Sequence, residues 1–229
     1  MKKIVLFDID GTILNVESSL ARSIFIDTFG EMFSIDISQN IPSFHGKTDL
    51  QIIADIAQLY KIDYSSSIEQ IWENIFEKFE QRISKDSITI LPGAAELIEE
   101  IDRADNFEMG LVTGNFRKNA YLKLSLVGLD RYFPFGGFGD DCPDRNKLPI
   151  IAIERAKQSK IIDESYSISN SVIIGDTFRD IQAAKSNSLK AVAVATGKAP
   201  SSELRHYTPD VLFEDLSDYK TVFDCLKKL

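Results

Sequence analysis

Ile-Val-Leu-Phe-Asp-Ile-Asp-Gly-Thr occupies residues 4–12 of this 229-residue chain. The first four residues are all apolar, which favours a strand that is buried on both faces of a parallel sheet. In sheets of this kind, ligands bind beyond the carboxyl ends of the strands. We therefore expect Asp8 and Asp10, which follow the apolar run directly, to face a functional site.

Similar short apolar runs recur along the chain, and each ends in a polar turn. They cover residues 109–112, 171–174 and 191–195. Helical patterns lie between them, at residues 94–104, 118–127, 148–159 and 178–186. Alternating strands and helices predict an α/β fold with a doubly wound, Rossmann-like parallel sheet.

The alternation stops between residues 16 and 86. Apolar residues there recur at spacings of three and four, as in Ile68, Ile71, Trp72 and Ile75, which is typical of amphipathic helices. We expect these apolar stripes to be internal packing of a helical cap domain, residues 16–86, inserted into a core formed by residues 1–15 and 87–229. Its place after the first strand puts the cap over the carboxyl edge of the sheet.

Charge and composition exclude some partners. The formal net charge is -9 and the sequence pI is near 4.8, which argues against nucleic acid because phosphate backbones are bound by clustered Lys and Arg. No stretch reaches the ~20 apolar residues of a membrane span. Cys142 and Cys225 fit no metal-ligand spacing, so we expect unpaired thiols in a cytoplasmic protein, with a single disulfide left open. The oligomeric state is also open.

Two carboxylates two residues apart suit phosphoryl chemistry. Asp8 can attack phosphorus while Asp10 handles the proton of the leaving group or of water, and Gly11 permits the tight turn. Asp and Gly are also common in turns that have no catalytic task. The remaining strand ends favour the catalytic interpretation.

Those strand ends supply phosphate and metal ligands. Thr113, Gly114 and Asn115 offer donors for phosphoryl oxygens, and Lys147 offers a positive charge beside them. Asp176, placed with Asp8, would form an oxygen-rich site suited to Mg²⁺.

These residues make the chain similar to the haloacid dehalogenase-like hydrolase superfamily. Four motifs stand in the order of that superfamily, at residues 8–12, at residues 111–114, at Lys147, and at residues 175–177 with Asp180. The resemblance covers essentially the whole chain, and the helical insertion resembles a C1 cap. Four ordered motifs are far more specific than one.

The resemblance implies a role for each acidic residue. Asp8 would be the nucleophile and a metal ligand, and Asp10 the general acid/base, with its backbone carbonyl on the metal. Asp176 would be the third ligand, and Asp180 would either support the ligands from behind or reach the metal through water.

The resemblance also implies the phosphate-binding groups. Thr113 and Lys147 would hold the phosphate, assisted by the backbone of Gly114 and Asn115. The lysine is followed here by Leu148-Pro149 instead of directly by proline, and Arg145 is close enough to compete, but we expect Lys147 to take this role.

The function implied is that of a Mg²⁺-dependent phosphatase that hydrolyses a small-molecule phosphate monoester through an aspartyl phosphate on Asp8. Residues 45–49, His-Gly-Lys-Thr-Asp, resemble the cap loop of phosphoglycolate-phosphatase-like members, in which Lys47 would select the leaving group. The alternative for this loop is a helix N-cap at Thr48 or Asp49. The alternative functions are a phosphomutase of the β-phosphoglucomutase type and a non-catalytic binding protein on the same fold.

Overall fold

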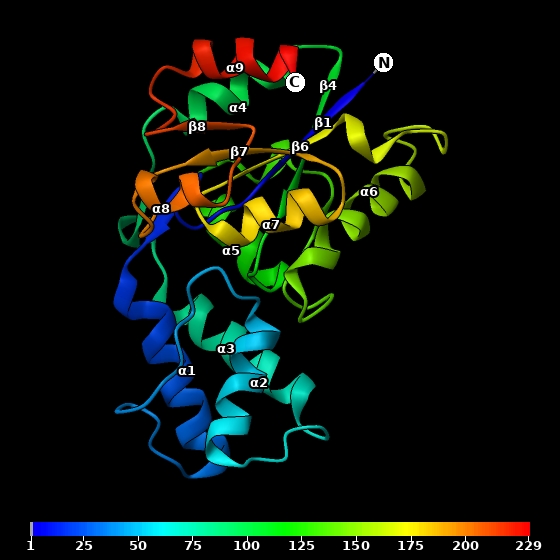
Figure 1. The fold of residues 1–229 in the computed structure, drawn as a ribbon. Coiled ribbons are helices and arrows are strands. Elements are labelled where there is room, and N and C mark those ends of the chain that lie inside the picture. Colours follow the sequence, from blue (N-terminus) through cyan, green and yellow to red (C-terminus); the bar gives the residue numbers. More distant parts are fainter. Residues whose placement is uncertain (1) are drawn as a thin grey trace.

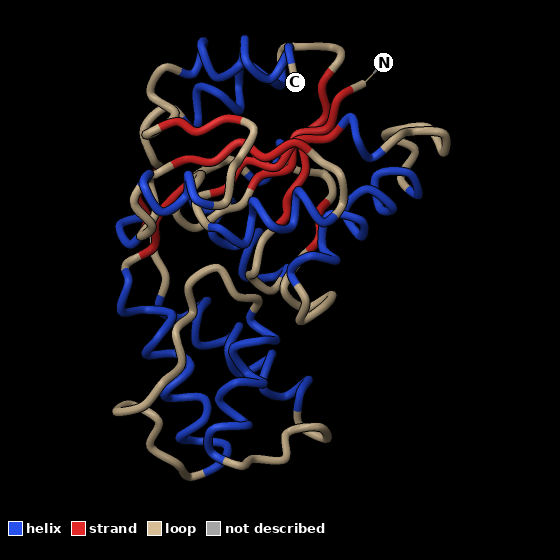
Figure 2. Tube along the Cα trace, viewed as in Figure 1, coloured by secondary structure: helices blue, strands red, loops and turns tan. Residues whose placement is uncertain are grey.

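The computed structural model describes residues 2–229 and contains a six-stranded, wholly parallel sheet with the strand order β5-β4-β1-β6-β7-β8. Its strands are β1 (Lys3–Phe7), β4 (Phe107–Val112), β5 (Gly136–Gly137), β6 (Ser171–Gly175), β7 (Lys190–Val194) and β8 (Val211–Phe213). Figure 2 shows these strands gathered in the upper part of the molecule. The doubly wound α/β fold predicted from the sequence is confirmed.

The sheet is sandwiched between two layers of helices, α4, α5 and α9 on one face and α6, α7 and α8 on the other. Their bounds are α4 (Ala94–Asp102), α5 (Arg117–Leu126), α6 (Leu148–Gln158), α7 (Phe178–Ser186), α8 (Ser201–His206) and α9 (Tyr219–Lys228). Short 3₁₀ turns complete the chain at η1 (Lys85–Ser87), η2 (Asp130–Tyr132), η3 (Arg145–Lys147) and η4 (Ile168–Asn170).

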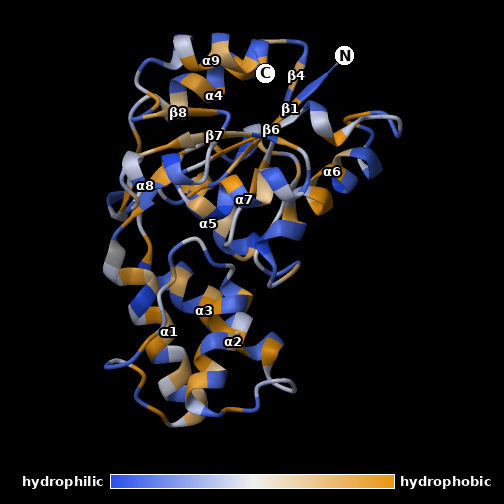
Figure 3. Ribbon diagram, viewed as in Figure 1, coloured by the Kyte–Doolittle hydropathy of each residue, from blue (hydrophilic) through white to orange (hydrophobic). Residues whose placement is uncertain are grey.

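Burial on both faces explains why β1 is apolar from Ile4 to Phe7. Val5 and Phe7 pack into the cluster that contains α4, α5 and α9. Ile4 and Leu6, which alternate with them, pack into the cluster that contains α6, α7 and α8. Figure 3 shows the apolar colouring of the central strands between the two helical layers.

A helical insertion, which we define as residues 17–87, leaves the core and returns to it through two paired strands. β2 (Leu14–Val16) and β3 (Ile88–Ile90) are antiparallel, with Val16 opposite Ile88. Between them lie α1 (Ser18–Phe33), α2 (Asp49–Tyr60) and α3 (Ile68–Arg82). Figure 1 shows these three helices as a separate group below the sheet. Helix α3 contacts α1 within the insertion and α5 of the core.

The apolar spacing in the insertion is packing, as predicted. Ile71, Ile75 and Phe79 form the buried stripe of α3, and Ile52, Ile53 and Ile56 belong to the buried stripe of α2. Cys142 and Cys225 are unpaired. None of the helices in the described part of the chain has the length and apolarity needed to cross a bilayer.

Candidate active site

The predicted site residues follow the ends of three neighbouring strands. Asp8 follows β1, Thr113 follows β4, and Asp176 follows β6. Because β1 lies between β4 and β6 and all three are parallel, their carboxyl ends meet at one edge of the sheet. All three residues are buried.

Gly11 makes the close approach between the first and third of these loops possible. Its φ is 91°, in the left-handed region, and a Cβ at this position would lie 2.4 Å from Oδ2 of Asp176. The neighbouring Thr12 donates a hydrogen bond from Oγ1 to Oδ1 of Asp176 at 3.4 Å. A side chain at residue 11 would therefore displace the Asp176 carboxylate.

Asp8, Asp176 and Asp180 form what we call the carboxylate cluster. One oxygen from each lies within 4.8 Å of the others, and all three residues are buried. Arg145 is buried beside them and places Nη2 at 2.9 Å from Oδ1 of Asp8 and 2.5 Å from Oδ1 of Asp180. The other oxygen of Asp180 accepts hydrogen bonds from the backbone N–H and hydroxyl of Thr177, in a capping box that starts α7.

The electrostatics of the carboxylate cluster suit a divalent cation. Three carboxylates face one guanidinium, an excess of two negative charges when all are ionised. Burial raises the pKa of Asp8 to about 6, against the opposing charge of Arg145. Burial, reinforced by the charges of Asp8 and Asp180, raises the pKa of Asp176 to about 9. Hard, closely spaced carboxylate oxygens that lack a full complement of positive charge fit a metal such as Mg²⁺.

Asp10 lies in different surroundings, which we call the Asp10 network. Its Oδ2 accepts hydrogen bonds from Nδ2 of Asn115 and from Nζ of Lys123, both at 2.7 Å. Oδ1 accepts a second contact from Lys123 at 2.8 Å. Asn115 also donates to Oγ1 of Thr113 at 2.8 Å and accepts from Lys123 at 2.7 Å.

The sequence reasoning missed Lys123. The residue lies at the end of the second turn of α5 and is only 4% exposed. The sequence does contain a pattern that places Lys123 on a buried face. The spacing of one helix face joins it to three other residues, and all four are buried: Asn119, Ala120, Lys123 and Leu124. A lysine on the apolar face of a helix needs an acidic partner, and that partner is Asp10.

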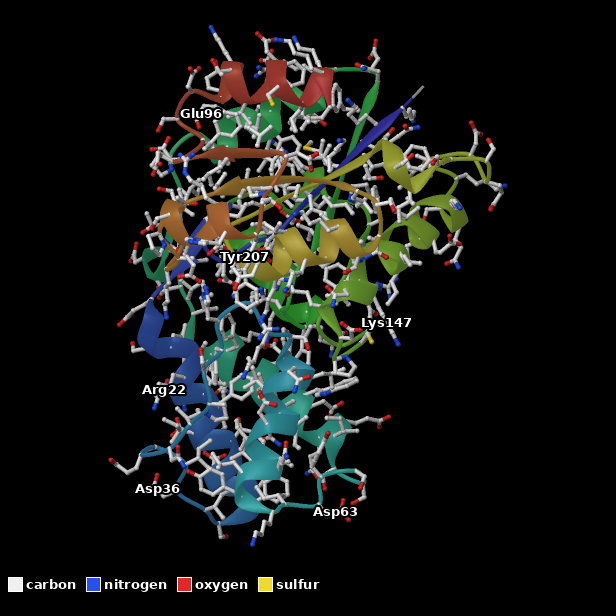
Figure 4. The ribbon with its side chains drawn as sticks, in the orientation of Figure 1. Arg22, Asp36, Asp63, Glu96, Lys147 and Tyr207 are labelled. Atoms are coloured by element: carbon white, nitrogen blue, oxygen red, sulfur yellow. The ribbon has the colours of Figure 1, made fainter. Side chains whose placement is uncertain are left out.

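The structure places Arg145, and not Lys147, against Asp8. The side chain of Arg145 is 6% exposed and forms the ion pairs described above, whereas Lys147 is exposed and lies at the outer edge of the molecule (Figure 4). Both residues belong to η3, in which about three residues complete a turn. Side chains two positions apart in such a turn point in different directions, so only one of the two cations can face the cluster.

The loop before α2 packs directly on the loop after β4. Gly114 accepts a hydrogen bond at its carbonyl from the N–H of Asp49 at 2.8 Å, and a Cβ on Gly114 would lie 2.1 Å from the carbonyl oxygen of Lys47. The carboxylate of Asp49 accepts a hydrogen bond from the N–H of Phe116 at 2.8 Å. The hydroxyl of Thr48 caps α2 by accepting from Gln51, as the N-cap interpretation predicts, and donates to Pro143 of the core.

Lys47 lines a cleft of about 450 Å³ between this loop and the core. Arg145 and Arg179 line the same cleft from the core side. Nζ of Lys47 forms an ion pair with Asp55 of α2 at 2.6 Å. Both sequence interpretations of the loop therefore have a structural counterpart, a helix cap at Thr48 and a cation in a cleft at Lys47.

The comparisons with known proteins agree with this arrangement. The profile of the haloacid dehalogenase-like hydrolase family matches residues 5–194. A pyrophosphatase, PpaX, from Oceanobacillus iheyensis is 24% identical over 219 residues, which is 95% of each chain. A phosphoglycolate phosphatase from Synechococcus elongatus is 29% identical over 132 residues, 58% of each chain. Among solved structures, a β-phosphoglucomutase from Clostridium difficile superposes with a TM-score of 0.71 at 20% identity and covers 98% of its own length and 100% of this chain.

Proposed function

This chain belongs to the haloacid dehalogenase-like hydrolases and is an enzyme of the phosphatase type, and from that premise we propose that it hydrolyses a small-molecule phosphate monoester through a phospho-enzyme on Asp8. The observation that carries the proposal is the ion pair of Asp8 with Arg145 inside the buried carboxylate cluster. A nucleophile, a cation for the phosphoryl oxygens and a metal-binding set of oxygens lie within one small volume. Phosphoryl transfer needs mainly such positioning and charge neutralisation.

The two aspartates divide the chemistry between them. An oxygen of Asp8 forms a bond to phosphorus as the bond from phosphorus to the leaving oxygen breaks, and Asp10 gives a proton to that leaving oxygen. Water then attacks the phosphorus of the acyl phosphate and gives a proton back to Asp10. The bond from phosphorus to Asp8 breaks, and inorganic phosphate leaves.

We propose Asp8, Asp176 and the backbone carbonyl of Asp10 as Mg²⁺ ligands, with Asp180 behind them. The cation, when bound, would offset the negative charge of the phosphoryl group. Asp180 fits a supporting position because its oxygens are already engaged by Arg145 and Thr177.

We propose that Arg145 holds the phosphoryl group in place of Lys147. Its guanidinium already lies 2.9 Å from the proposed nucleophile, and its planar fork can bind two phosphate oxygens. Thr113 and the backbone of Gly114 and Asn115 are the remaining candidates for phosphate binding. The side chain of Asn115 orients Asp10 as well.

We propose that the helical insertion, residues 17–87, acts as a cap. The division predicted from the sequence, residues 16–86 against residues 1–15 and 87–229, differs from it by one residue at each end. Lys47 would then meet the leaving group of an anionic substrate in the cleft between insertion and core. Phosphoglycolate and pyrophosphate are the first compounds to test, since the similar proteins carry those names. Unpaired Cys142 and Cys225 agree with a cytoplasmic location.

The test is phosphate release from p-nitrophenyl phosphate, phosphoglycolate, pyrophosphate and glucose 1-phosphate, with Mg²⁺ and with excess EDTA. We expect turnover that EDTA abolishes and added Mg²⁺ restores. Full activity in EDTA would contradict the metal site. Conversion of glucose 1-phosphate to glucose 6-phosphate without net phosphate release would identify a phosphomutase, and no turnover of any compound would favour a binding protein.

A further inference from the structure

Lys123 is a buried lysine to which the mechanism above gives no task. Its ammonium makes three contacts of 2.7 to 2.8 Å, two with the oxygens of Asp10 and one with Oδ1 of Asn115. The side chain of Lys123 is 5% exposed, whereas that of Asp10 is 41% exposed. The lysine is thus the fixed member of the pair, held within the packed face of α5.

The contacts of Lys123 hold the Asp10 carboxylate in one orientation. A buried ammonium is costly unless it is paired, so the lysine holds its partner strongly. Both oxygens of Asp10 are engaged by Lys123, and Asn115 adds a third contact, to Oδ2. A side chain with 41% of its surface exposed would otherwise sample several rotamers.

The helical insertion contributes to the environment of the same lysine. The ammonium of Lys123 lies 5.4 Å from the ring centroid of Phe79, which is buried on α3. If α3 moved away, Lys123 would keep its contacts with Asp10 and Asn115 but would lose the cover of the Phe79 ring. Exposed ion pairs contribute much less than buried ones to holding a side chain in place. Contact between insertion and core therefore strengthens the hold on Asp10.

We propose that Lys123 is a positioning residue that orients Asp10 for proton transfer and makes this orientation depend on the docked helical insertion. This inference rests on the proposed role of Asp10 as the acid/base. Among the described residues, the polar contacts of Lys123 are with Asp10 and Asn115, so it would act through Asp10. The rival explanation is that Lys123 only fastens α5 to α3.

The experiment compares phenyl phosphate with p-nitrophenyl phosphate in Lys123→Met. The two substrates have nearly the same shape, but phenolate leaves less readily than nitrophenolate and depends more on the proton. Single-turnover release of the phenol isolates the first chemical step. We expect the rate with phenyl phosphate to fall on the order of 10-fold further than the rate with p-nitrophenyl phosphate, with KM nearly unchanged for both.

Lys118→Met is the matched control. Lys118 lies on the same helix and also contacts α3, with its ammonium 5.2 Å from the ring centroid of Phe76, but it is exposed and outside the Asp10 network. Its removal should leave the ratio of the two rates at the wild-type value. Lys123→Arg keeps the positive charge, so its ratio of the two rates should lie between the ratios of Lys123→Met and of the wild type.

A double-mutant cycle with Asp10→Asn separates positioning from packing. If Lys123 acts through Asp10, adding Lys123→Met to Asp10→Asn should not change the ratio further. An unchanged ratio in Lys123→Met, or a full additional change in the double variant, would overturn the proposal. Should Lys123→Met not fold, Lys123→Gln carries the same comparison. Failure of the proposed function would look different, because the wild-type protein itself would then release no phenol.

Discussion

Asp8 and Asp10 are two residues apart, yet they lie in opposite electrostatic surroundings. Asp8 is 4% exposed, shares its site with two other carboxylates, and has a pKa raised to about 6 by burial. Asp10 has a side chain that is 41% exposed and receives its hydrogen bonds from an ammonium and an amide. Both sites touch the helical insertion, the carboxylate cluster through Arg145, which donates to the carbonyl of Gly46 at 3.3 Å, and the Asp10 network through Phe79.

The difference teaches how one short turn can serve two kinds of chemistry. A buried group among like charges is suited to bind a cation and to attack phosphorus. A carboxylate reached by solvent can exchange protons, and the donors that contact it fix its direction. Each of the following changes tests whether this division is real.

The largest effect is expected from Asp8→Asn. The amide has nearly the same shape but cannot attack phosphorus, so turnover should fall on the order of 10⁴-fold or more. The fold should survive, because the change removes one of three clustered negative charges. Phosphate release and circular dichroism on the same preparation check this. Retained activity would remove Asp8 from its proposed role.

Arg145→Met should produce the next largest loss, on the order of 10²- to 10³-fold in kcat, because it removes the cation beside Asp8. Lys147→Met is the paired control and should stay within about twofold of the wild type, since surface charges act weakly. Steady-state kinetics on both variants test which of the two side chains, Arg145 or Lys147, binds the phosphoryl group. Arg145→Lys keeps the comparison available if loss of the charge unfolds the protein. A larger loss in Lys147→Met than in Arg145→Met would support the role predicted for Lys147 from the sequence.

Asp10→Asn should reduce turnover by on the order of 10²- to 10⁴-fold, with a larger loss for an alkyl phosphate such as glycerol 2-phosphate than for p-nitrophenyl phosphate. The alkoxide needs a proton on leaving, whereas the nitrophenolate is stable without one. The phospho-enzyme should also last longer, because water has lost its base. Rapid-quench measurement of both steps checks this. Equal losses with both substrates and no accumulation of phospho-enzyme would mean that Asp10 only organises the site.

Lys47→Ala tests whether the insertion selects substrate. We expect kcat/KM for an anionic substrate such as phosphoglycolate to fall on the order of 10-fold, while p-nitrophenyl phosphate is nearly unaffected. Asp55→Asn is the control, because it removes the ion pair between Lys47 and Asp55 but keeps the lysine. Equal losses on both substrates in Lys47→Ala would indicate that the loop is structural.

The smallest effect concerns Asp49, which joins the insertion to the start of α5. Burial raises the pKa of Asp49 to about 7, against the hydrogen bond from Phe116 and the charge of Lys123, while the charges of Asp10 and Asp140 add to the rise. A raised pKa in the folded state adds stability that is complete below the ordinary value of 3.8 and is lost as the pH rises through about 7.

Asp49→Asn keeps the acceptor oxygen but stays neutral at every pH. The Tm of the variant minus the Tm of wild type should therefore be larger at about pH 8.5 than at about pH 5. Each kcal/mol by which ionisation of Asp49 destabilises the wild type should add about 2 to 4 °C to this difference. Calorimetry at the two pH values measures this difference, with the exposed Asp86→Asn as a control. A difference that does not change with pH would show that Asp49 titrates normally.

The apolar strands and the residues at their ends were predictable because both follow from local pattern. β1, β4, β6 and β7 are buried along most of their length, so their sequences are mainly apolar. β5 was not predicted because it consists of Gly136 and Gly137, which carry no side chain to reveal a pattern. Its place in the sheet depends on pairing with β4.

The cations of the site were harder to predict because their roles depend on direction and distant partners. Arg145 lies two positions before Lys147, the residue predicted as the third motif, and the turn of η3 decides which of the two side chains faces Asp8. Lys123 and Asp10 are separated by 113 positions. Their meeting requires that β1 and β4 be neighbours, which no local pattern states.

The pairing of β2 with β3 has a consequence for how this chain folds and changes. Val16 and Ile88 are paired across the β2–β3 ladder, so the insertion leaves and re-enters the core at neighbouring points, as the loop of a hairpin does. The entropy of closing a loop grows only slowly with its length, so β1 can find β4 at small extra cost whatever lies between. Residues 17–87 can accordingly be lengthened, shortened or exchanged for another module while the sheet and its catalytic edge keep their register. The contacts that the insertion makes with the core, such as that of Phe79 with Lys123, are the part of it that such a change would have to preserve.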